Sequence, residues 1–583
     1  MSKPFITLPT LTLQSLFEFS IDRYANKPFV QFIGEKSLTY KEFATQVYAT
    51  QDILNHYGIR EGDKVAIYSE NMPNWSIVYF AVTTLGAVIV PILPDFHTSE
   101  AMHIANHAEC KAAFISQKLF ETMLDETKPP KLNLLVIIDN LSVLEKLSTP
   151  STVEKVLQKG GEKLTQAMDK FNKEETESHT LEIDEDDLAA IIYTSGTTGS
   201  SKGVMLSHKN ITFDASTAQH VVDIYPEDRF MSILPLAHTF ECTVGMIVPF
   251  LNGASIHYGK KPPTPSILLK AFASVKPTFM LSVPLVIEKI FKNKVEPNFQ
   301  KNIVIRSLYK IPFVRKKLNK IAGKKLKQSF GGELKFFGIG GASLSPSIEK
   351  FLREAEFPYS IGYGLTETAP ILAGANPSLT KYRAIGPALQ GVTLELRDQK
   401  ENGEGTLWAK GPNVMQGYYR DPEKTAEVLS EDGWFNTEDI GYFDEDGYFF
   451  MSGRAKNIIV GATGENIYPE QIEGIVDAHP LVSDSLVYDD KGTLTARIYL
   501  DYEKLDNLLG IHHTSETKTH KKIDDILEEI RLDTNEKVSS FSRIKKIIEQ
   551  RDEFVKTPTK KIKRYLYVEP PIRVETYDKN KTK

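Results

Sequence analysis

A short run of glycine, serine and threonine residues that includes a lysine is the part of this sequence best suited to chemistry. Residues 193–204 read Tyr-Thr-Ser-Gly-Thr-Thr-Gly-Ser-Ser-Lys-Gly-Val and follow an apolar stretch at 188–192. Glycines allow tight turns that point successive backbone N–H groups at an anion, and hydroxyl groups add further donors. The run therefore predicts a loop that binds a polyphosphate. Its contacting residues would be Thr194, Ser195, Gly196, Thr197, Thr198, Gly199 and Lys202.

Two common phosphate-binding motifs do not fit this sequence. The motif G-x-x-x-x-G-K-[ST] requires a glycine directly before the lysine, and position 201 is serine. A dinucleotide fingerprint G-x-G-x-x-G that began at Gly338 would require a glycine where the sequence has Ser343. Neither a P-loop kinase nor a nicotinamide enzyme is therefore supported. Composition alone leaves a flexible surface loop as the other interpretation of residues 193–204.

Further stretches suited to nucleotide binding follow this loop. Residues 340–343 read Gly-Gly-Ala-Ser after an apolar stretch, and a strand that ends in glycines lets a flat base approach the backbone. Residues 363–370 read Tyr-Gly-Leu-Thr-Glu-Thr-Ala-Pro, 434–441 read Trp-Phe-Asn-Thr-Glu-Asp-Ile-Gly, and 556–564 read Lys-Thr-Pro-Thr-Lys-Lys-Ile-Lys-Arg. In content and order, these motifs and the loop resemble those of the AMP-forming acyl-adenylate ligases. That superfamily contains acyl-CoA synthetases, peptide-synthetase adenylation domains and luciferases.

The resemblance implies a nucleotide site. Tyr363 would stack near adenine, beside Gly364 of the same motif, and Thr366 would meet the α-phosphate. Asp439 would take the ribose hydroxyls, and Arg454 would make a second ribose contact. Glu438 stands where the family usually has glycine, which leaves the local turn open. The residues implied for the adenine turn are Gly341, Ala342 and Ser343.

The same resemblance implies a metal site and a catalytic lysine. Thr197 and Glu367 would bind Mg²⁺, a hard cation that oxygen ligands suit. Aligned on Ile562, the catalytic lysine is Lys561, while Lys560 occupies the position of the usual glycine and is a possible substitute. Lys202 would add positive charge at the phosphates.

Two further residues are implied by neighbouring motifs. His238, in the run Pro-Leu-Ala-His-Thr-Phe-Glu at 235–241, would close off the carboxylate pocket. Lys456 stands where the family has its interdomain hinge. An isolated histidine or lysine is more often structural or solvated, so these two assignments depend on the motifs around them.

The sequence indicates the identity of the acyl group less directly. Residues 282–291 are largely apolar and precede a long basic insert, which resembles the long-chain fatty acyl-CoA synthetase branch. The implied function is ATP-dependent conversion of a long-chain fatty acid to acyl-AMP and then acyl-CoA, with ATP, Mg²⁺ and coenzyme A. Two alternatives remain: an enzyme that loads the phosphopantetheine of a carrier protein, and a non-catalytic relative that binds ATP or fatty acid.

Short β-rich runs alternate with helical patterns along most of the chain, which predicts α/β layers with largely parallel sheets. The expected strands include 64–70, 112–117, 134–139 and 188–195. A buried helix is expected over about 73–85, with a buried strand over 87–92. After residue 390, short strands with Gly and Asp-Gly turns predict a β-rich subdomain. The resemblance implies a large N-terminal adenylate-forming domain at 1–454 and a small mobile α/β lid domain at 455–583.

Composition sets limits on partners and compartment. The chain has 583 residues, 41% hydrophobic and 25% charged, with a formal net charge of -6, so no global basic field would hold nucleic acid. Two cysteines cannot build a disulfide framework, which favours a cytoplasmic location. Residues 289–327, however, hold 13 Lys or Arg and one acidic residue, Glu296. Interleaved apolar residues predict peripheral contact with an anionic membrane, at its inner face. Three alternatives remain for these residues: a solvated loop, part of a site for the phosphates of coenzyme A, and a weak nucleic-acid patch. The oligomeric state is left open.

Overall fold

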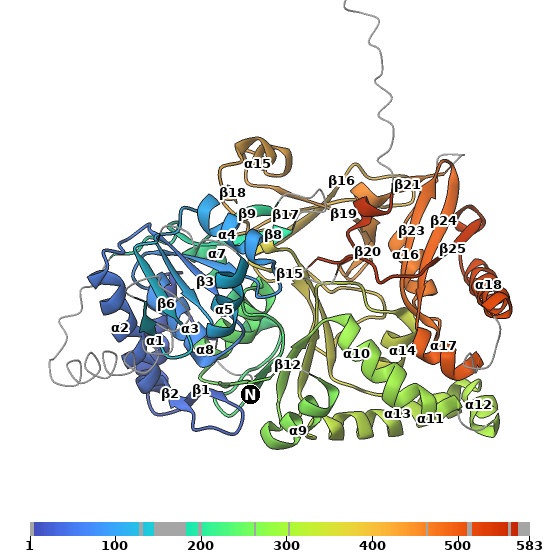
Figure 1. Cartoon of the computed structure of the whole chain (residues 1–583), viewed down its shortest axis with the longest axis horizontal. Coiled ribbons are helices and arrows are strands. Elements are labelled where there is room, and N and C mark those ends of the chain that lie inside the picture. Colours follow the sequence, from blue (N-terminus) through green and yellow to red (C-terminus); the bar gives the residue numbers. More distant parts are fainter. Residues whose placement is uncertain are drawn as a thin grey trace, which may run out of the picture. The chain divides into compact units, whose positions relative to one another are not determined.

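The computed structural model describes most of the chain, in two compact units (Figure 1). Unit 1 contains the described residues of Met1–Thr194 and Ser201–Ala455, and unit 2 contains Ser195 and the described residues from Lys456 onward. Among the described residues, no helix is both long enough and apolar enough to cross a membrane. The residues described are 5–126, 132–144, 182–195, 201–261, 264–300, 303–461, 465–509, 516–557 and 561–568.

Five of the residues singled out in the sequence lie outside the described residues. They are Gly196, Thr197, Thr198 and Gly199 of the phosphate loop and Lys560 near the end of the chain. Of Ser195 only the backbone is described, as the last residue of a strand.

The first sheet of unit 1 has the strand order β18-β9-β8-β4-β3-β5-β6-β7. Its central strands run parallel, and their nearly continuous apolar sequences suit a sheet that is covered on both faces. The strands expected in this part of the sequence are present. Their bounds are β3 (Lys64–Tyr68), β4 (Val88–Ile92), β5 (Ala112–Ile115), β6 (Leu134–Ile137), β7 (Ser142–Val143), β8 (Leu188–Ser195), β9 (Ser201–Ser207) and β18 (Gly417–Tyr418).

The second sheet has the order β15-β14-β13-β12-β10-β11-β1-β2. All of its strands except the two edge strands β2 and β15 pair in parallel, so their carboxyl ends meet at one edge of the sheet. The bounds are β1 (Pro28–Phe32), β2 (Leu38–Thr39), β10 (Arg229–Ser232), β11 (Ser255–Tyr258), β12 (Phe279–Ser282), β13 (Phe336–Ile339), β14 (Tyr359–Gly364) and β15 (Ile371–Gly374).

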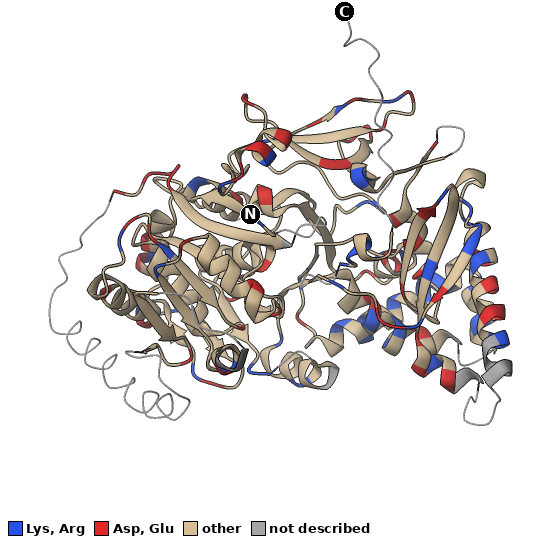
Figure 2. Cartoon of the chain, turned by 45° about the horizontal axis from the view of Figure 1, so that its top comes forward, with Lys and Arg blue, Asp and Glu red and all other residues tan. Residues whose placement is uncertain are grey.

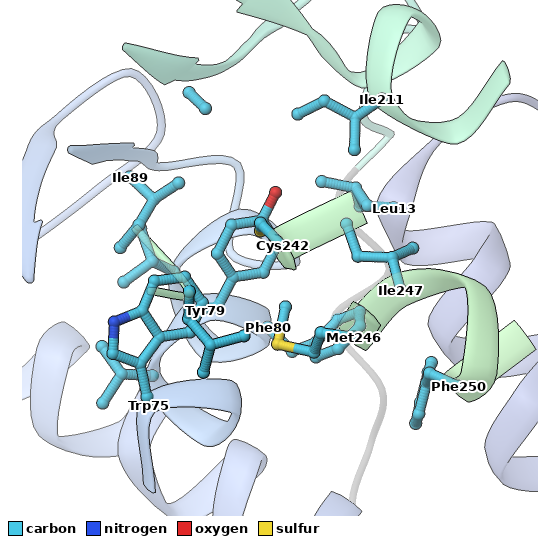
Figure 3. Packing of buried hydrophobic residues seen from close by; sticks show 14 of the residues in the cluster. Leu13, Trp75, Tyr79, Phe80, Ile89, Ile211, Cys242, Met246, Ile247 and Phe250 are labelled. Atoms are coloured by element: carbon cyan, nitrogen blue, oxygen red, sulfur yellow. The ribbon is translucent and has the colours of Figure 1, made fainter. Parts of the chain in front are cut away.

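Helices between the two sheets share one core with both of them. The expected buried helix is α3 (Pro73–Thr83), in which Trp75 to Thr83 are all buried, as suits a helix covered on every side. Figure 3 shows Trp75, Tyr79 and Phe80 of this helix near Cys242 and Met246. The other helices that contribute to this core are α1 (Leu13–Tyr24), α2 (Tyr40–His56), α7 (His208–Thr217), η2 (Phe240–Ile247) and α8 (Val248–Asn252).

Two smaller cores cover the outer faces of the sheets. Helices α4 (Thr98–His107) and α5 (Gln117–Glu126) contribute to the core on the first sheet. The second sheet is covered by α9 (Pro265–Val275), α10 (Pro284–Ile290), η3 (Phe291–Val295), α13 (Pro312–Ser329) and α14 (Pro346–Glu354). Two short helices, α11 (Glu296–Gln300) and α12 (Ile303–Tyr309), precede α13.

The β-rich part predicted after residue 390 is an antiparallel sheet of unit 1 with the order β16-β17-β19-β20. Its strands are β16 (Thr393–Arg397), β17 (Gly405–Lys410), β19 (Phe435–Phe443) and β20 (Phe449–Arg454), and α15 (Pro422–Val428) lies between β18 and β19 in the sequence. Three single turns complete the unit: η1 (Ala218–His220), η4 (Thr366–Thr368) and η5 (Ala455–Asn457), the last continuing into unit 2.

Unit 2 is a small α/β domain. Its sheet has the order β23-β24-β25, with β23 and β24 antiparallel and β25 parallel to β24. Apolar residues of this sheet and of its helices form a separate core. The elements are β21 (Ile459–Val460), β22 (Asn466–Ile467), α16 (Pro469–Val476), β23 (Val482–Asp490), β24 (Thr493–Leu500), α17 (Tyr502–Leu509), α18 (Glu516–Asn535), η7 (Ser540–Ser542), β25 (Lys546–Gln550) and η8 (Arg564–Leu566).

Candidate active site

The two ends of the predicted phosphate loop are attached to the same helix, α4. Before the loop, the Tyr193 hydroxyl lies 2.6 Å from Nδ1 of His107. After it, the Ser201 hydroxyl donates to Oε1 of Glu100 at 3.0 Å. Burial raises the pKa of Tyr193 and lowers that of His107, so the phenol keeps its proton and a neutral imidazole can accept it. Thr194, at the end of β8, is half-buried.

Lys202, Tyr418 and Glu367 form a connected group beside this loop. The short strand β18 pairs with β9, with Tyr418 opposite Val204. The Lys202 ammonium lies 4.7 Å from the centre of the Tyr418 ring, and the Tyr418 hydroxyl donates to Oε1 of Glu367 at 2.9 Å. Burial, and then the nearby Glu367 carboxylate, raise the pKa of Tyr418, so its hydroxyl remains a donor. Tyr418 therefore orients the Glu367 carboxylate, which is predicted to bind Mg²⁺. Thr366 precedes Glu367 in the single turn η4.

Tyr363 and Arg454 both bind the buried carboxylate of Asp439. The Tyr363 hydroxyl donates to Oδ2 at 2.6 Å, and Nε of Arg454 donates to Oδ1 at 3.0 Å. Asp439 is fully buried, and it faces Arg454 across β19 and β20. These two donors fix the orientation of the carboxylate that is predicted to meet the ribose hydroxyls. The structure therefore joins three residues that are 15 to 91 positions apart in the sequence.

The residue before Asp439 has a backbone conformation that suits glycine. Glu438 adopts a left-handed backbone conformation with φ of 60°, a region that a residue with a Cβ atom enters at a cost of about 1–2 kcal/mol. Its N–H donates to Oδ1 of Asn436 at 2.9 Å, and the Asp439 N–H donates to the Thr437 hydroxyl at 3.1 Å. The turn left open by this substitution thus forms with glutamate in place.

The adenine turn and Tyr363 emerge at the same edge of the second sheet. Strands β13 and β14 are parallel neighbours, with Ile339 opposite Ile361, so the turn at 340–343 and Tyr363 follow from adjacent carboxyl ends. Gly341 takes a φ of 83°. At Gly364 a Cβ atom would lie 1.6 Å from the Pro370 carbonyl oxygen, so only glycine fits there. Ala342 and Ser343 are exposed beside it.

His238 belongs to the same edge because its segment follows β10. The His238 side chain is half-buried, and Nδ1 accepts the Phe240 N–H at 3.3 Å. The Phe240 ring lies against the adenine turn, since a Cβ atom on Gly340 would lie 3.1 Å from it. The structure thus brings the segment of His238 to the predicted nucleotide site.

Glu241, three residues after His238, is a buried acid that the sequence did not reveal as unusual. Its Oε2 atom is buried and has no hydrogen-bond partner among the described residues. A Cβ atom on Gly245 would lie 2.8 Å from the carboxyl group, which is therefore enclosed by its own helical segment. Burial raises its pKa from 4.5 to about 8, so the carboxyl group carries a proton at neutral pH.

Replacing Glu241 with glutamine is expected to flatten the dependence of stability on pH. The raised pKa means that the folded protein retains a proton that the unfolded chain releases above 4.5. Wild-type stability should therefore fall as the pH rises from 4.5 towards 8, by about 1.4 kcal/mol per pH unit from this group. Thermal unfolding midpoints at pH 5, 6, 7 and 8 would measure the slope for each protein. Equal slopes in wild type and variant would contradict the buried, protonated state, and the exposed Glu431→Gln serves as control.

The segment that carries Lys561 is fastened within unit 2. Lys561 is exposed. Its backbone N–H donates to the Thr557 hydroxyl at 3.1 Å, and the Thr557 N–H donates to the carbonyl oxygen of Lys561 at 2.7 Å. Three residues later, Arg564 donates to both carboxylate oxygens of Glu473 in α16, each at 2.5 Å. Arg564 is therefore a positioning residue that sequence reasoning did not assign. Lys456, the predicted hinge, lies in η5 where unit 2 begins.

Comparison with known proteins identifies the family to which these motifs belong. The family model for AMP-binding enzymes matches residues 17–419, which is more than half of the chain. The chain belongs to the AMP-binding enzyme family. The resemblance drawn from the motifs is thereby confirmed, and this AMP-binding enzyme is an adenylate-forming ligase related to acyl-CoA synthetases.

Curated relatives of this AMP-binding enzyme cover most of its length. Long chain acyl-CoA synthetase 7, peroxisomal, of Arabidopsis thaliana is 28% identical over 532 residues, 84% of this chain and 74% of the relative. Fatty acyl-CoA synthetase A of Dictyostelium discoideum is 28% identical over 569 residues, 91% of this chain and 84% of the relative. Long-chain-fatty-acid--CoA ligase 1 of Homo sapiens is 30% identical over 502 residues, 80% of this chain and 70% of the relative.

Solved structures share the fold of this AMP-binding enzyme. ATP-bound MatB from Rhodopseudomonas palustris has a TM-score of 0.72 at 23% identity and covers 95% of this chain and 98% of its own. MenE of Bacillus subtilis in complex with ATP and magnesium ion has a TM-score of 0.69 at 19% identity, covering 94% and 98%. These likenesses confirm the predicted α/β fold with large N-terminal sheets and a small C-terminal domain.

Proposed function

We propose that this protein activates a long-chain fatty acid with ATP and transfers the acyl group to coenzyme A, releasing pyrophosphate and AMP. The observation that carries the proposal is the likeness, over 80% to 91% of the chain, to two proteins named as acyl-CoA synthetases and one named as a long-chain fatty acid–CoA ligase. The chemistry requires adenylation because a carboxylate is a poor acyl donor, and converting one of its oxygens into part of AMP creates a leaving group.

In this proposal, unit 1 binds the nucleotide. Asp439, held by Tyr363 and Arg454, would accept hydrogen bonds from the ribose hydroxyls. Adenine would lie along the glycine turn at 340–343. Lys202 and the loop before it would hold the phosphates, and Thr366 would contact the α-phosphate.

Glu367 suits a magnesium ion because the cation is usually held by one or two carboxylates together with phosphates and water. Tyr418 donates to one oxygen of that carboxylate and lies beside Lys202, which would contact the phosphates. Thr197 would be the second protein ligand. When bound, Mg²⁺ would neutralise charge on the phosphate oxygens.

Two displacements then complete the reaction. A carboxylate oxygen of the fatty acid attacks the α-phosphorus in line, and the bond from that phosphorus to pyrophosphate breaks. Lys561 would stabilise the negative charge that develops on the phosphate oxygens. The thiol sulfur of coenzyme A next attacks the acyl carbonyl carbon, its proton is released, and the bond to AMP breaks. His238 would close the carboxylate pocket, and Lys456 would act as hinge between domains at 1–454 and 455–583.

An ATP–pyrophosphate exchange assay over acids from acetate to oleate tests this function. We expect palmitate or oleate to exceed acetate by about 100-fold or more in kcat/KM, because each buried methylene contributes ~0.8 kcal/mol. A maximum at a short acid would contradict the long-chain assignment, and no exchange with any acid would favour a non-catalytic relative. If exchange is seen, supplying free coenzyme A or a holo-carrier protein decides the acceptor, and loading of the carrier alone would contradict transfer to coenzyme A.

A further inference from the structure

The helices α12 and α13 present basic and apolar side chains together on one surface of unit 1. Among the described residues, 19 large hydrophobic side chains are exposed, and six of these lie between residues 303 and 321. Helix α13 as a whole carries seven basic residues and no acidic one, in a chain whose formal net charge is -6, and five of the seven are exposed. The six exposed apolar residues are Ile303, Val304, Leu308, Ile311, Phe313 and Ile321.

The opposite face of α13 is packed, so the direction of the exposed face is fixed. Asn319, Gly323 and Leu326 are buried at helical spacing. A Cβ atom on Gly323 would lie 2.4 Å from the Ala355 carbonyl oxygen, so α13 and the end of α14 approach closely. Arg315 makes a bidentate ion pair with Glu354, which also accepts a bond from the Asn319 amide. Arg315 is therefore a packing residue rather than part of the exposed surface.

The short helix α12 is held against α13 through Tyr309. The Tyr309 hydroxyl donates to Oδ1 of Asn319 at 2.8 Å, and the Tyr309 ring stacks on Phe299 with 4.6 Å between ring centres. Because α12 is fixed here, its exposed Ile303, Val304 and Leu308 extend the apolar part of the α13 surface. The labels in Figure 1 show α12 near one end of α13.

The basic residues of the exposed face are available to an external anion. Basic residues recur along α13, and α12 carries Arg306; Lys and Arg are coloured blue in Figure 2. No carboxylate among the described residues pairs with Lys316, Lys317, Lys324 or Lys325, whereas Lys320 pairs with the exposed Glu356. The Lys317 ammonium lies 4.5 Å from the centre of the Phe313 ring, so charge and apolar surface adjoin directly.

We infer that this surface docks on an anionic lipid bilayer. Apolar side chains such as Phe313 and Ile321 would enter the boundary between headgroups and acyl chains, while the lysines would contact lipid phosphates. A purely solvated charged face would not expose these apolar groups, and an apolar protein interface would not surround them with one sign of charge. Docking would let the enzyme take a long-chain acid from the bilayer, a benefit that rests on the proposed function, whereas docking itself does not.

Sedimentation of the whole protein with vesicles tests the inference without any mutation. We expect the wild type to pellet with phosphatidylglycerol vesicles at low salt, to be released near ~0.5 M salt, where the Debye length is only a few ångströms, and to remain in solution with phosphatidylcholine vesicles. No pelleting with phosphatidylglycerol vesicles, or equal pelleting with both lipids, would overturn the inference.

Two sets of substitutions then locate the surface. Replacing Lys316, Lys317, Lys324 and Lys325 with glutamine is expected to lower the bound fraction at least tenfold, as is Phe313→Ser together with Ile321→Ser. The control replaces Lys27, Lys36, Lys41 and Lys118, which are exposed elsewhere on unit 1, with glutamine and removes the same charge. Thermal unfolding verifies that each variant is folded.

Three results would overturn the assignment. One is unchanged pelleting of both α13 variants, and another is equal loss in the control. The third is a lysine variant that pellets like the wild type but has a raised KM for coenzyme A in an assay with a short, soluble acid. That result would assign the lysines to the binding of the coenzyme A phosphates. Failure of ATP–pyrophosphate exchange with every acid would instead refute the proposed function and leave the vesicle result standing.

Discussion

Replacing Lys561 with alanine is expected to lower acid-dependent ATP–pyrophosphate exchange by about 100- to 1,000-fold, the loss typical when one group that stabilises transition-state charge is removed. The same variant should still convert synthetic acyl-AMP and coenzyme A to thioester, because the resemblance implies that Lys561 serves only the first step and moves away with the small domain for the second. The two half-reactions would be measured separately on the same preparation. Because Lys561 is exposed, we expect the variant to fold as the wild type does, and thermal unfolding checks this.

A neighbouring lysine provides the matched control. Lys563 lies in the same segment, where its N–H donates to the Val555 carbonyl at 2.9 Å, and Lys563→Ala should leave both half-reactions close to wild type. Equal loss of both half-reactions in folded Lys561→Ala would contradict the assignment. Normal exchange in that variant, with exchange lost in Lys560→Ala, would transfer the catalytic role to Lys560.

Replacing Glu367 with glutamine should reduce kcat by about 100-fold or more, because the substitution keeps the size of the side chain and removes the charge that would bind Mg²⁺. The half-saturating concentration of Mg²⁺ should rise, which a change in folding alone would not produce. Titrating Mg²⁺ at saturating ATP and fatty acid measures both effects.

Tyr418→Phe tests the positioning of the same carboxylate. This substitution removes the hydroxyl that donates to Glu367 at 2.9 Å. It should lower activity by about 10- to 100-fold, as is typical when a residue that orients a metal ligand is replaced. The exposed Glu423→Gln, which also removes one negative charge, should have no effect. Wild-type activity of Glu367→Gln at ordinary Mg²⁺ concentrations would show that Glu367 is not a ligand.

The motifs and the strands could be predicted from the sequence because each of them depends on residues that are close together in the chain. Apolar runs such as 64–70 and 188–195 predicted strands that the structure contains as β3 and β8. The uncharged stretch around α3 was correctly assigned to a buried helix and strand. The motif at 363–370 was likewise recognisable, because glycine at 364 is the residue that its tight turn requires.

The partners of these motif residues were decided only by the tertiary structure. Tyr418 meets Glu367 because β18 pairs with β9, and Arg564 meets Glu473 across 91 residues of sequence. Neither pairing leaves a local pattern, since hydrogen bonds between distant segments depend on the packing of whole sheets. The sequence by itself therefore determined the family, the α/β fold and the types of residue at the site. The tertiary structure decided which side chains orient them, because burial and hydrogen bonding are set by contacts between remote parts of the chain.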